Sequence, residues 1–73
     1  MKIIKTYQSK DNTKKASIVL SDEIFVVEFY ENNKTVGIIE YPNKAFGYVD
    51  DAAENWANGV MTRETIDHYT RAA

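Results

Sequence analysis

The sequence has no cysteine, one histidine, one proline and three glycines among its 73 residues. Without cysteine, neither a disulfide nor a thiolate metal site can form, and one histidine cannot complete a zinc site alone. A domain of this size buries only about 60% of the surface that its unfolded chain exposes. Small domains therefore usually gain stability from disulfides, metals or oligomerisation. The composition leaves oligomerisation open.

Long apolar runs are also missing. No run approaches the roughly 18 residues that a membrane span needs. The first six residues are charged but precede no hydrophobic segment, so we expect no signal peptide. The apolar fraction of 44% and the aromatic fraction of 12% argue against disorder. We therefore expect one small soluble domain over residues 1–73, without a membrane segment, in a reducing and cytoplasmic compartment.

Four β-rich segments occupy the first part of the chain, at residues 2–7, 15–20, 24–31 and 35–41. Asn32–Asn33 tolerates the positive φ of a tight hairpin, and Pro42 ends the fourth segment. Short connections favour sequential antiparallel pairing. The loop over residues 8–14 leaves the partner of the first strand open, so the sequence predicts a three- to four-stranded meander.

From Tyr48 onward the hydrophobic period becomes helical. One helix face carries apolar residues at i, i+3, i+4, i+7 and i+11, namely Val49, Ala52, Ala53, Trp56 and Val60. Asn58–Gly59 favours a helix end, and Thr62 is a candidate cap for a second, short helix over residues 63–69. The predicted fold class is α+β, with the meander sheet followed by one helix on one face and a short C-terminal helix. Trp56 is the expected core anchor.

The third strand is apolar on both faces. Phe25, Val27 and Phe29 alternate with a second set formed by Ile24, Val26 and Tyr30, which only Glu28 interrupts. We expect Val19 and either Ile38 or Ile39 to extend this second apolar face. One helix covers one face, so the second face favours a homodimer. In the alternative interpretation, a strongly twisted sheet lets the second helix wrap over that side.

Charge is distributed unevenly along the chain. Residues 1–15 hold one acid and five lysines, which sum to +4: Lys2, Lys5, Lys10, Lys14 and Lys15. Residues 16–73 hold four bases and ten acids, which sum to −6. The lysines are typical of a solvated edge strand that resists aggregation. Alternatively they bind nucleic acid, with strand aromatics stacking on bases: Tyr7, Tyr30, Tyr41, Phe25 and Phe29.

Acidic side chains gather on the predicted helix at Asp50, Asp51 and Glu54. We interpret them as acids near a helix N-terminus, where the macrodipole favours them, and as a candidate surface for a basic partner. Too few oxygen ligands are present for a calcium or magnesium site. Glu64 and His68 lie at helical spacing but lack a nucleophile or an oxyanion donor. We therefore expect neither an enzyme nor a bound cofactor.

The helix run from Tyr48 to Val60, with its acidic, alanine-rich "ENW" pattern, resembles small uncharacterised proteins of tailed phages, particularly phages of marine cyanobacteria. The strand run from Phe25 to Asn32 is similar to them as well, so the resemblance spans residues 24–61. It implies strands followed by a helix and an accessory protein that engages a host component. It carries no catalytic residues.

The function expected from the sequence is a small, non-enzymatic protein-interaction module. We expect a homodimeric phage accessory protein that binds a host or phage protein in the host cell cytoplasm. The candidate partner-binding residues lie on the acidic helix and the second sheet face: Asp50, Asp51, Glu54, Ile24, Val26 and Tyr30. The alternative is nucleic-acid binding through the five N-terminal lysines.

Overall fold

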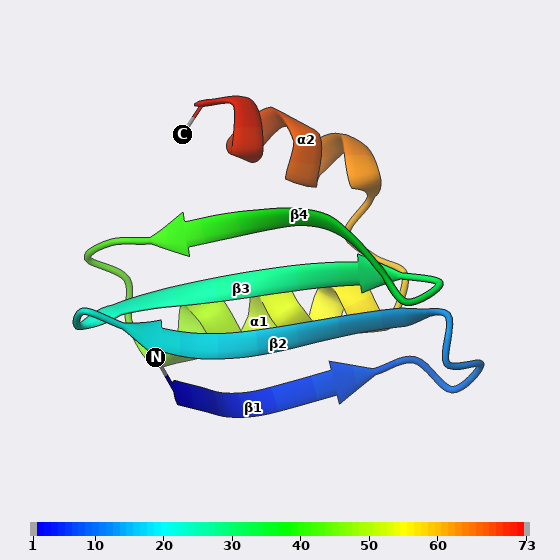
Figure 1. Cartoon of the computed structure of the whole chain (residues 1–73), viewed down its shortest axis with the longest axis horizontal. Coiled ribbons are helices and arrows are strands. Elements are labelled where there is room, and N and C mark those ends of the chain that lie inside the picture. Colours follow the sequence, from blue (N-terminus) through cyan, green and yellow to red (C-terminus); the bar gives the residue numbers. More distant parts are fainter. Residues whose placement is uncertain (1, 73) are drawn as a thin grey trace.

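The computed structural model describes the backbone of residues 2–72 and the side chains of residues 2–67. The elements in chain order are β1 (Lys2–Gln8), β2 (Lys14–Ser21), β3 (Ile24–Glu31), β4 (Lys34–Tyr41), α1 (Phe46–Ala57) and α2 (Arg63–Ala72). All neighbouring strands are antiparallel, in the order β1-β2-β3-β4 (Figure 1). The predicted α+β meander is confirmed, with four strands and with β1 beside β2.

Two tight turns set the register of the central strands. Asp22 and Glu23 have φ of 51° and 68°, and Asn32 and Asn33 have φ of 52° and 66°. Positive φ at both central residues is the type I′ geometry, whose twist matches that of paired strands. β2 and β3 consequently pair without a break, from Lys14 opposite Glu31 to Ser21 opposite Ile24.

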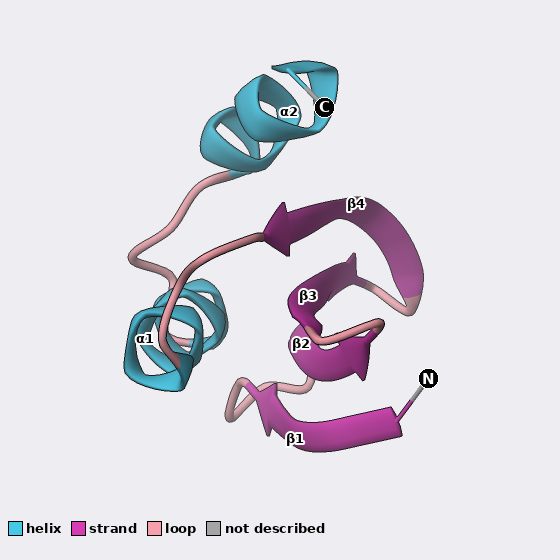
Figure 2. Ribbon diagram, turned by 90° about the vertical axis from the view of Figure 1, so that its left-hand side faces the viewer, coloured by secondary structure: helices cyan, strands magenta, loops and turns pink. Residues whose placement is uncertain are grey.

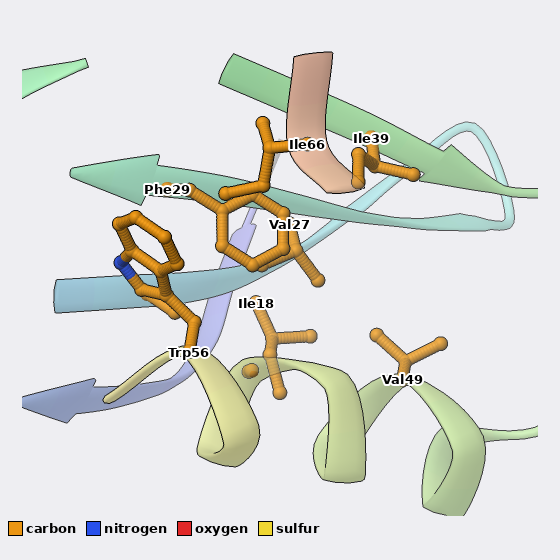
Figure 3. Close-up of a cluster of buried hydrophobic side chains, with 9 residues drawn as sticks. Ile18, Val27, Phe29, Ile39, Val49, Trp56 and Ile66 are labelled. Atoms are coloured by element: carbon orange, nitrogen blue, oxygen red, sulfur yellow. The ribbon is translucent and has the colours of Figure 1, made fainter. Parts of the chain in front are cut away.

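The core lies between one face of the sheet, here called the inner face, and the two helices. Its fully or almost fully buried members are Ala16, Ile18, Val27, Phe29, Ile39, Val49, Ala53, Trp56 and Ile66 (Figure 3). Trp56 meets Phe29 edge to face, with 5.8 Å between ring centroids. Its indole Nε1 donates a 3.0 Å hydrogen bond to the Tyr30 carbonyl oxygen. Trp56 thus anchors α1 to β3, as the sequence predicts.

The end of α1 corrects one prediction. The helix begins at Phe46, two residues before Tyr48, and ends at Ala57. Gly59 then turns the chain with a φ of +79°. Val60 therefore lies beyond the helix and is 69% exposed, so its predicted place on the inner helix face is wrong. The glycine conformation overrides the hydrophobic spacing because it redirects the backbone before Val60 is reached.

The second helix closes the core on the β4 side. α1 packs mainly on β2 and β3, whereas α2 packs on β4. Ile66 of α2 is fully buried, and Arg63 forms a 3.8 Å ion pair with Glu31 at the end of β3. Figure 2 shows α1 on one side of the sheet and α2 beyond β4. Within residues 2–72, neither helix covers the opposite side, so α2 does not wrap over the second face. No helix in that range has the length and apolarity needed to cross a bilayer.

Candidate interaction surfaces

The sheet face turned away from α1, here called the outer face, carries apolar side chains from all four strands at positions set by the strand register. Val19 pairs with Val26 at its centre, Ile3 pairs with Val19 from β1, and Ile38 projects from β4 opposite Glu28. Ile3 is 65% exposed and Ile38 is 45% exposed. The predicted second apolar face therefore exists, and Ile38 rather than Ile39 belongs to it, since Ile39 lies in the core.

The centre of the outer face forms a shallow hollow of about 280 Å³. Val19, Ser21, Val26, Glu28, Ile38 and Glu40 line it. Val19 is only 1% exposed and Ser17 is 7% exposed, so the middle of β2 is already covered on this face. The exposed Ile3 and Ile38 project from β1 and β4, on either side of the two central strands.

Three polar side chains form a chain of contacts at one end of the outer face. The Lys15 Nζ atom lies 4.5 Å from the centroid of the Tyr30 ring. The Tyr30 hydroxyl donates a 3.0 Å hydrogen bond to Glu28 Oε2. Burial, together with the hydrogen bond and charge of Glu28, raises the pKa of the Tyr30 phenol above its ordinary value. These contacts hold one positive and one negative charge in fixed positions beside the apolar centre.

The three acidic residues of α1, Asp50, Asp51 and Glu54, differ in their contacts with the rest of the chain. Asp50 accepts a 2.8 Å hydrogen bond from the Tyr7 hydroxyl and lies 3.4 Å from Lys5 Nζ. The Tyr7 hydroxyl, followed by the charge of Asp50, raises the pKa of the Lys5 ammonium. Asp50 therefore ties α1 to β1, while Asp51 and Glu54 are exposed to solvent. None of the three lies in the first helical turn, so their interpretation as N-terminal dipole partners is wrong.

The five N-terminal lysines do not share one surface. The register puts Lys2, Lys5 and Lys14 on the inner side and Lys15 on the outer face, while Lys10 lies in the β1–β2 loop. The Lys14 Nζ atom sits 4.7 Å from the Trp56 ring centroid, and Lys5 pairs with Asp50. Nucleic-acid binding through these lysines stays a prediction.

The aromatic residues divide between the faces in the same way. Tyr7, Phe25, Phe29 and Tyr41 pack with the core, and only Tyr30 of the predicted set lies on the outer face. The prediction of a shared aromatic platform for stacking bases is therefore wrong. Alternation along β3 separates Tyr30 from Phe25 and Phe29, because odd and even positions point to opposite faces.

A second concave surface, here called the inter-helix groove, lies between α1, α2 and the end of β4. It encloses about 420 Å³, with Tyr41, Tyr48, Lys44 and Met61 among its lining residues. Tyr41 and Tyr48 meet edge to face at 5.9 Å between centroids, and Lys44 Nζ lies 4.8 Å from the Tyr48 centroid. This groove was not predicted from the sequence, because its position depends on how each of the two helices packs on the sheet.

No catalytic or metal-binding cluster is found where side chains are described. Across residues 2–67, no three carboxylate or imidazole groups converge as metal ligands would. The side chain of His68, and with it the predicted Glu64–His68 pair, lies outside the described residues. The only strongly shifted carboxyl in that range is Asp11, whose pKa falls to about 2 because Ser9 and Thr13 donate hydrogen bonds to it in the β1–β2 loop.

Comparison with protein-family models, with curated proteins and with solved structures gives no match to this chain. The surfaces described above are therefore the basis for a function.

Proposed function

We propose that this protein is a small, non-enzymatic protein-interaction module that self-associates through its outer sheet face. The observation that carries this proposal is the pair of exposed isoleucines, Ile3 and Ile38, beside the half-buried Val26 on a sheet whose inner face is already closed by α1 and α2. Antiparallel sheets with one solvated face normally place polar residues there. The exposed Ile3 and Ile38 instead favour burial against another protein surface.

The size of the outer face fits a weak dimer. Four strands about 4.8 Å apart, with seven or eight residues each at about 3.4 Å per residue, cover on the order of 500 Å². Two such faces bury about 1,000 Å² in total, which is the lower limit for a specific interface. Interfaces near this limit are typical of weak and transient association, so monomer and dimer should both be populated in solution.

Self-association leaves the helical side of the molecule for a different partner. Asp51 and Glu54 are exposed on α1 and suit a basic surface of a host or phage protein. Asp50 contributes less, because Tyr7 and Lys5 already engage it. The proposed biological role is a phage accessory protein that acts in the host cell cytoplasm, and it is supported by the resemblance of residues 24–61 to proteins of tailed phages.

Sedimentation equilibrium tests the self-association. The parent protein should show a reversible monomer–dimer equilibrium over about 1 µM to 1 mM, and Ile38→Glu should weaken it by at least about tenfold, because a carboxylate would be buried in the interface. Val60→Glu is the matched control, since Val60 is also a β-branched apolar residue, 69% exposed against 45% for Ile38, but lies outside the sheet. A parent protein that stays monomeric at every concentration would contradict the proposal. Equal effects of the two variants would contradict the assignment to the outer face.

A further inference from the structure

The outer face carries its charges in an asymmetric arrangement. Lys15 is on β2, opposite Tyr30, and Glu28 is on β3, one cross-strand pair further along the face. Tyr30 bridges the two, with Lys15 over its ring and its hydroxyl donating to Glu28. Glu40 is on β4, opposite Val26. The positive charge of Lys15 thus lies on β2 and the nearest negative charge, that of Glu28, lies on the neighbouring β3.

A two-fold axis parallel to the strands, between β2 and β3, makes this arrangement self-complementary. Such an axis places β2 of one copy over β3 of the other and keeps each residue at its level along the strands. The half-buried Val26 then lies at the level of Val19 of the partner subunit, which is already covered by its own chain. Lys15 faces Tyr30 of the partner subunit and lies diagonal to the Glu28 of that subunit, and the lysine and glutamate side chains together can span the separation of about 10 Å between stacked sheets.

The exposed isoleucine of β1 fits the same geometry. β1 lies over β4 of the second copy, so Ile3, which is 65% exposed, lies at the level of Glu40 of the partner subunit and diagonal to its Ile38, the two residues that line this side of the 280 Å³ hollow. Aligned packing of two twisted sheets, with strands about 30° apart, is compatible with an axis close to the strand direction.

An axis running across the strands through Val19 and Val26 is less complementary. It would set Glu40 beside its own counterpart, where two like charges repel. Lys15 would then approach the Asp22–Glu23 turn of the second copy rather than its Glu28.

We propose that the occupant of the outer face is a second copy of this chain, related by a two-fold axis parallel to β2 and β3, with Lys15 of each copy paired to Glu28 of the other. This inference rests on the proposed self-association and adds its geometry. Each charge pair occurs twice in the dimer, so a single reversal places two like-charged pairs in the interface.

A charge-reversal mixing experiment tests the axis. Lys15→Glu and Glu28→Lys should each raise the dimer dissociation constant by about tenfold or more when studied alone. An equimolar mixture should recover nearly the parent affinity, because all pairs across the mixed interface are then opposite in charge. Native mass spectrometry of the mixture, with one variant isotope-labelled, should find mainly mixed dimers. Lys10→Glu and Glu64→Lys make the same charge changes outside the face and should leave the dissociation constant unchanged. Circular dichroism verifies that each variant is folded.

The outcomes test the direction of the two-fold axis separately from the self-association itself. If the parent protein dimerises and Ile38→Glu disrupts it, but mixing does not restore affinity, the axis is wrong and the proposed function stands. If Asp22→Lys or Glu23→Lys, and not Glu28→Lys, restores the dimer affinity of Lys15→Glu in a mixture, the axis runs across the strands and not parallel to them. A monomeric parent protein would overturn both.

Discussion

Removal of the Trp56 side chain is expected to be among the most destabilising changes to this fold. Trp56 is fully buried, packs against Phe29 with 5.8 Å between ring centroids and donates a 3.0 Å hydrogen bond to the Tyr30 carbonyl. Replacing a large buried aromatic residue by alanine costs about 3–5 kcal/mol. A chain of 73 residues has an unfolding free energy of about 4–11 kcal/mol. Trp56→Ala should therefore remove between about a quarter and all of the stability.

Thermal unfolding followed by circular dichroism measures this loss, since the variant removes the only tryptophan and with it the indole fluorescence. One kcal/mol corresponds to about 4–8 °C at this chain length, so Trp56→Ala should lower Tm by at least about 12 °C. Trp56→Phe keeps an aromatic ring but loses the donor to Tyr30, and should cost about 1–2 kcal/mol. Val60→Ala, at an exposed site, should cost less than about 0.5 kcal/mol.

All variants are compared at one protomer concentration, because dimerisation contributes to apparent stability. A Trp56→Ala protein that melts cooperatively within about 4 °C of the parent would refute the anchoring role of Trp56. Equal losses in Trp56→Ala and Trp56→Phe would instead assign the whole effect to the hydrogen bond with Tyr30.

Two further predictions concern the β2–β3 turn and the acidic surface of α1. Glu23 has a φ of 68°, a left-handed conformation that costs a non-glycine residue about 1 kcal/mol. Glu23→Gly should therefore raise the unfolding free energy, measured by urea titration, by about 0.5–1 kcal/mol. Glu40→Gly, within β4, should lower the unfolding free energy. Joint neutralisation by Asp51→Asn and Glu54→Gln should abolish capture of a basic partner protein from nuclease-treated bacterial lysate, while leaving dimerisation unchanged. Unaltered capture would contradict a role for the acidic surface, and enrichment that disappears with nuclease would instead favour nucleic-acid binding.

Local sequence signals predicted the central hairpin correctly. The bounds of β3 and the turn at Asn32–Asn33 follow from β-branched residues flanked by residues that tolerate positive φ. Burial of Trp56 likewise followed from helical spacing. These features depend on neighbours within a few positions, so a single sequence is sufficient to find them.

Features that arise from tertiary contacts were missed or misread. β1 shifts register between Ile3 and Lys5, which puts Ile3 on the outer face and Lys5 beside Asp50, and the sequence contains no local signal for that shift. Asp50 was expected to be free for a partner, yet Tyr7, which lies 43 positions away in the sequence, donates a hydrogen bond to it. The inter-helix groove depends on the placement of α2 over β4, which helical periodicity alone does not specify.

The central claim is that the outer face meets a second copy of the chain. The most direct test is an isotope-filtered nuclear Overhauser spectrum of a mixture of labelled and unlabelled protein, recorded above the dimer dissociation constant. The account predicts intermolecular contacts between Ile3 and Ile38, and between the Tyr30 ring and the Lys15 side chain. Intermolecular contacts confined to Tyr48 and Met61 of the inter-helix groove, or none from the outer face, would contradict it.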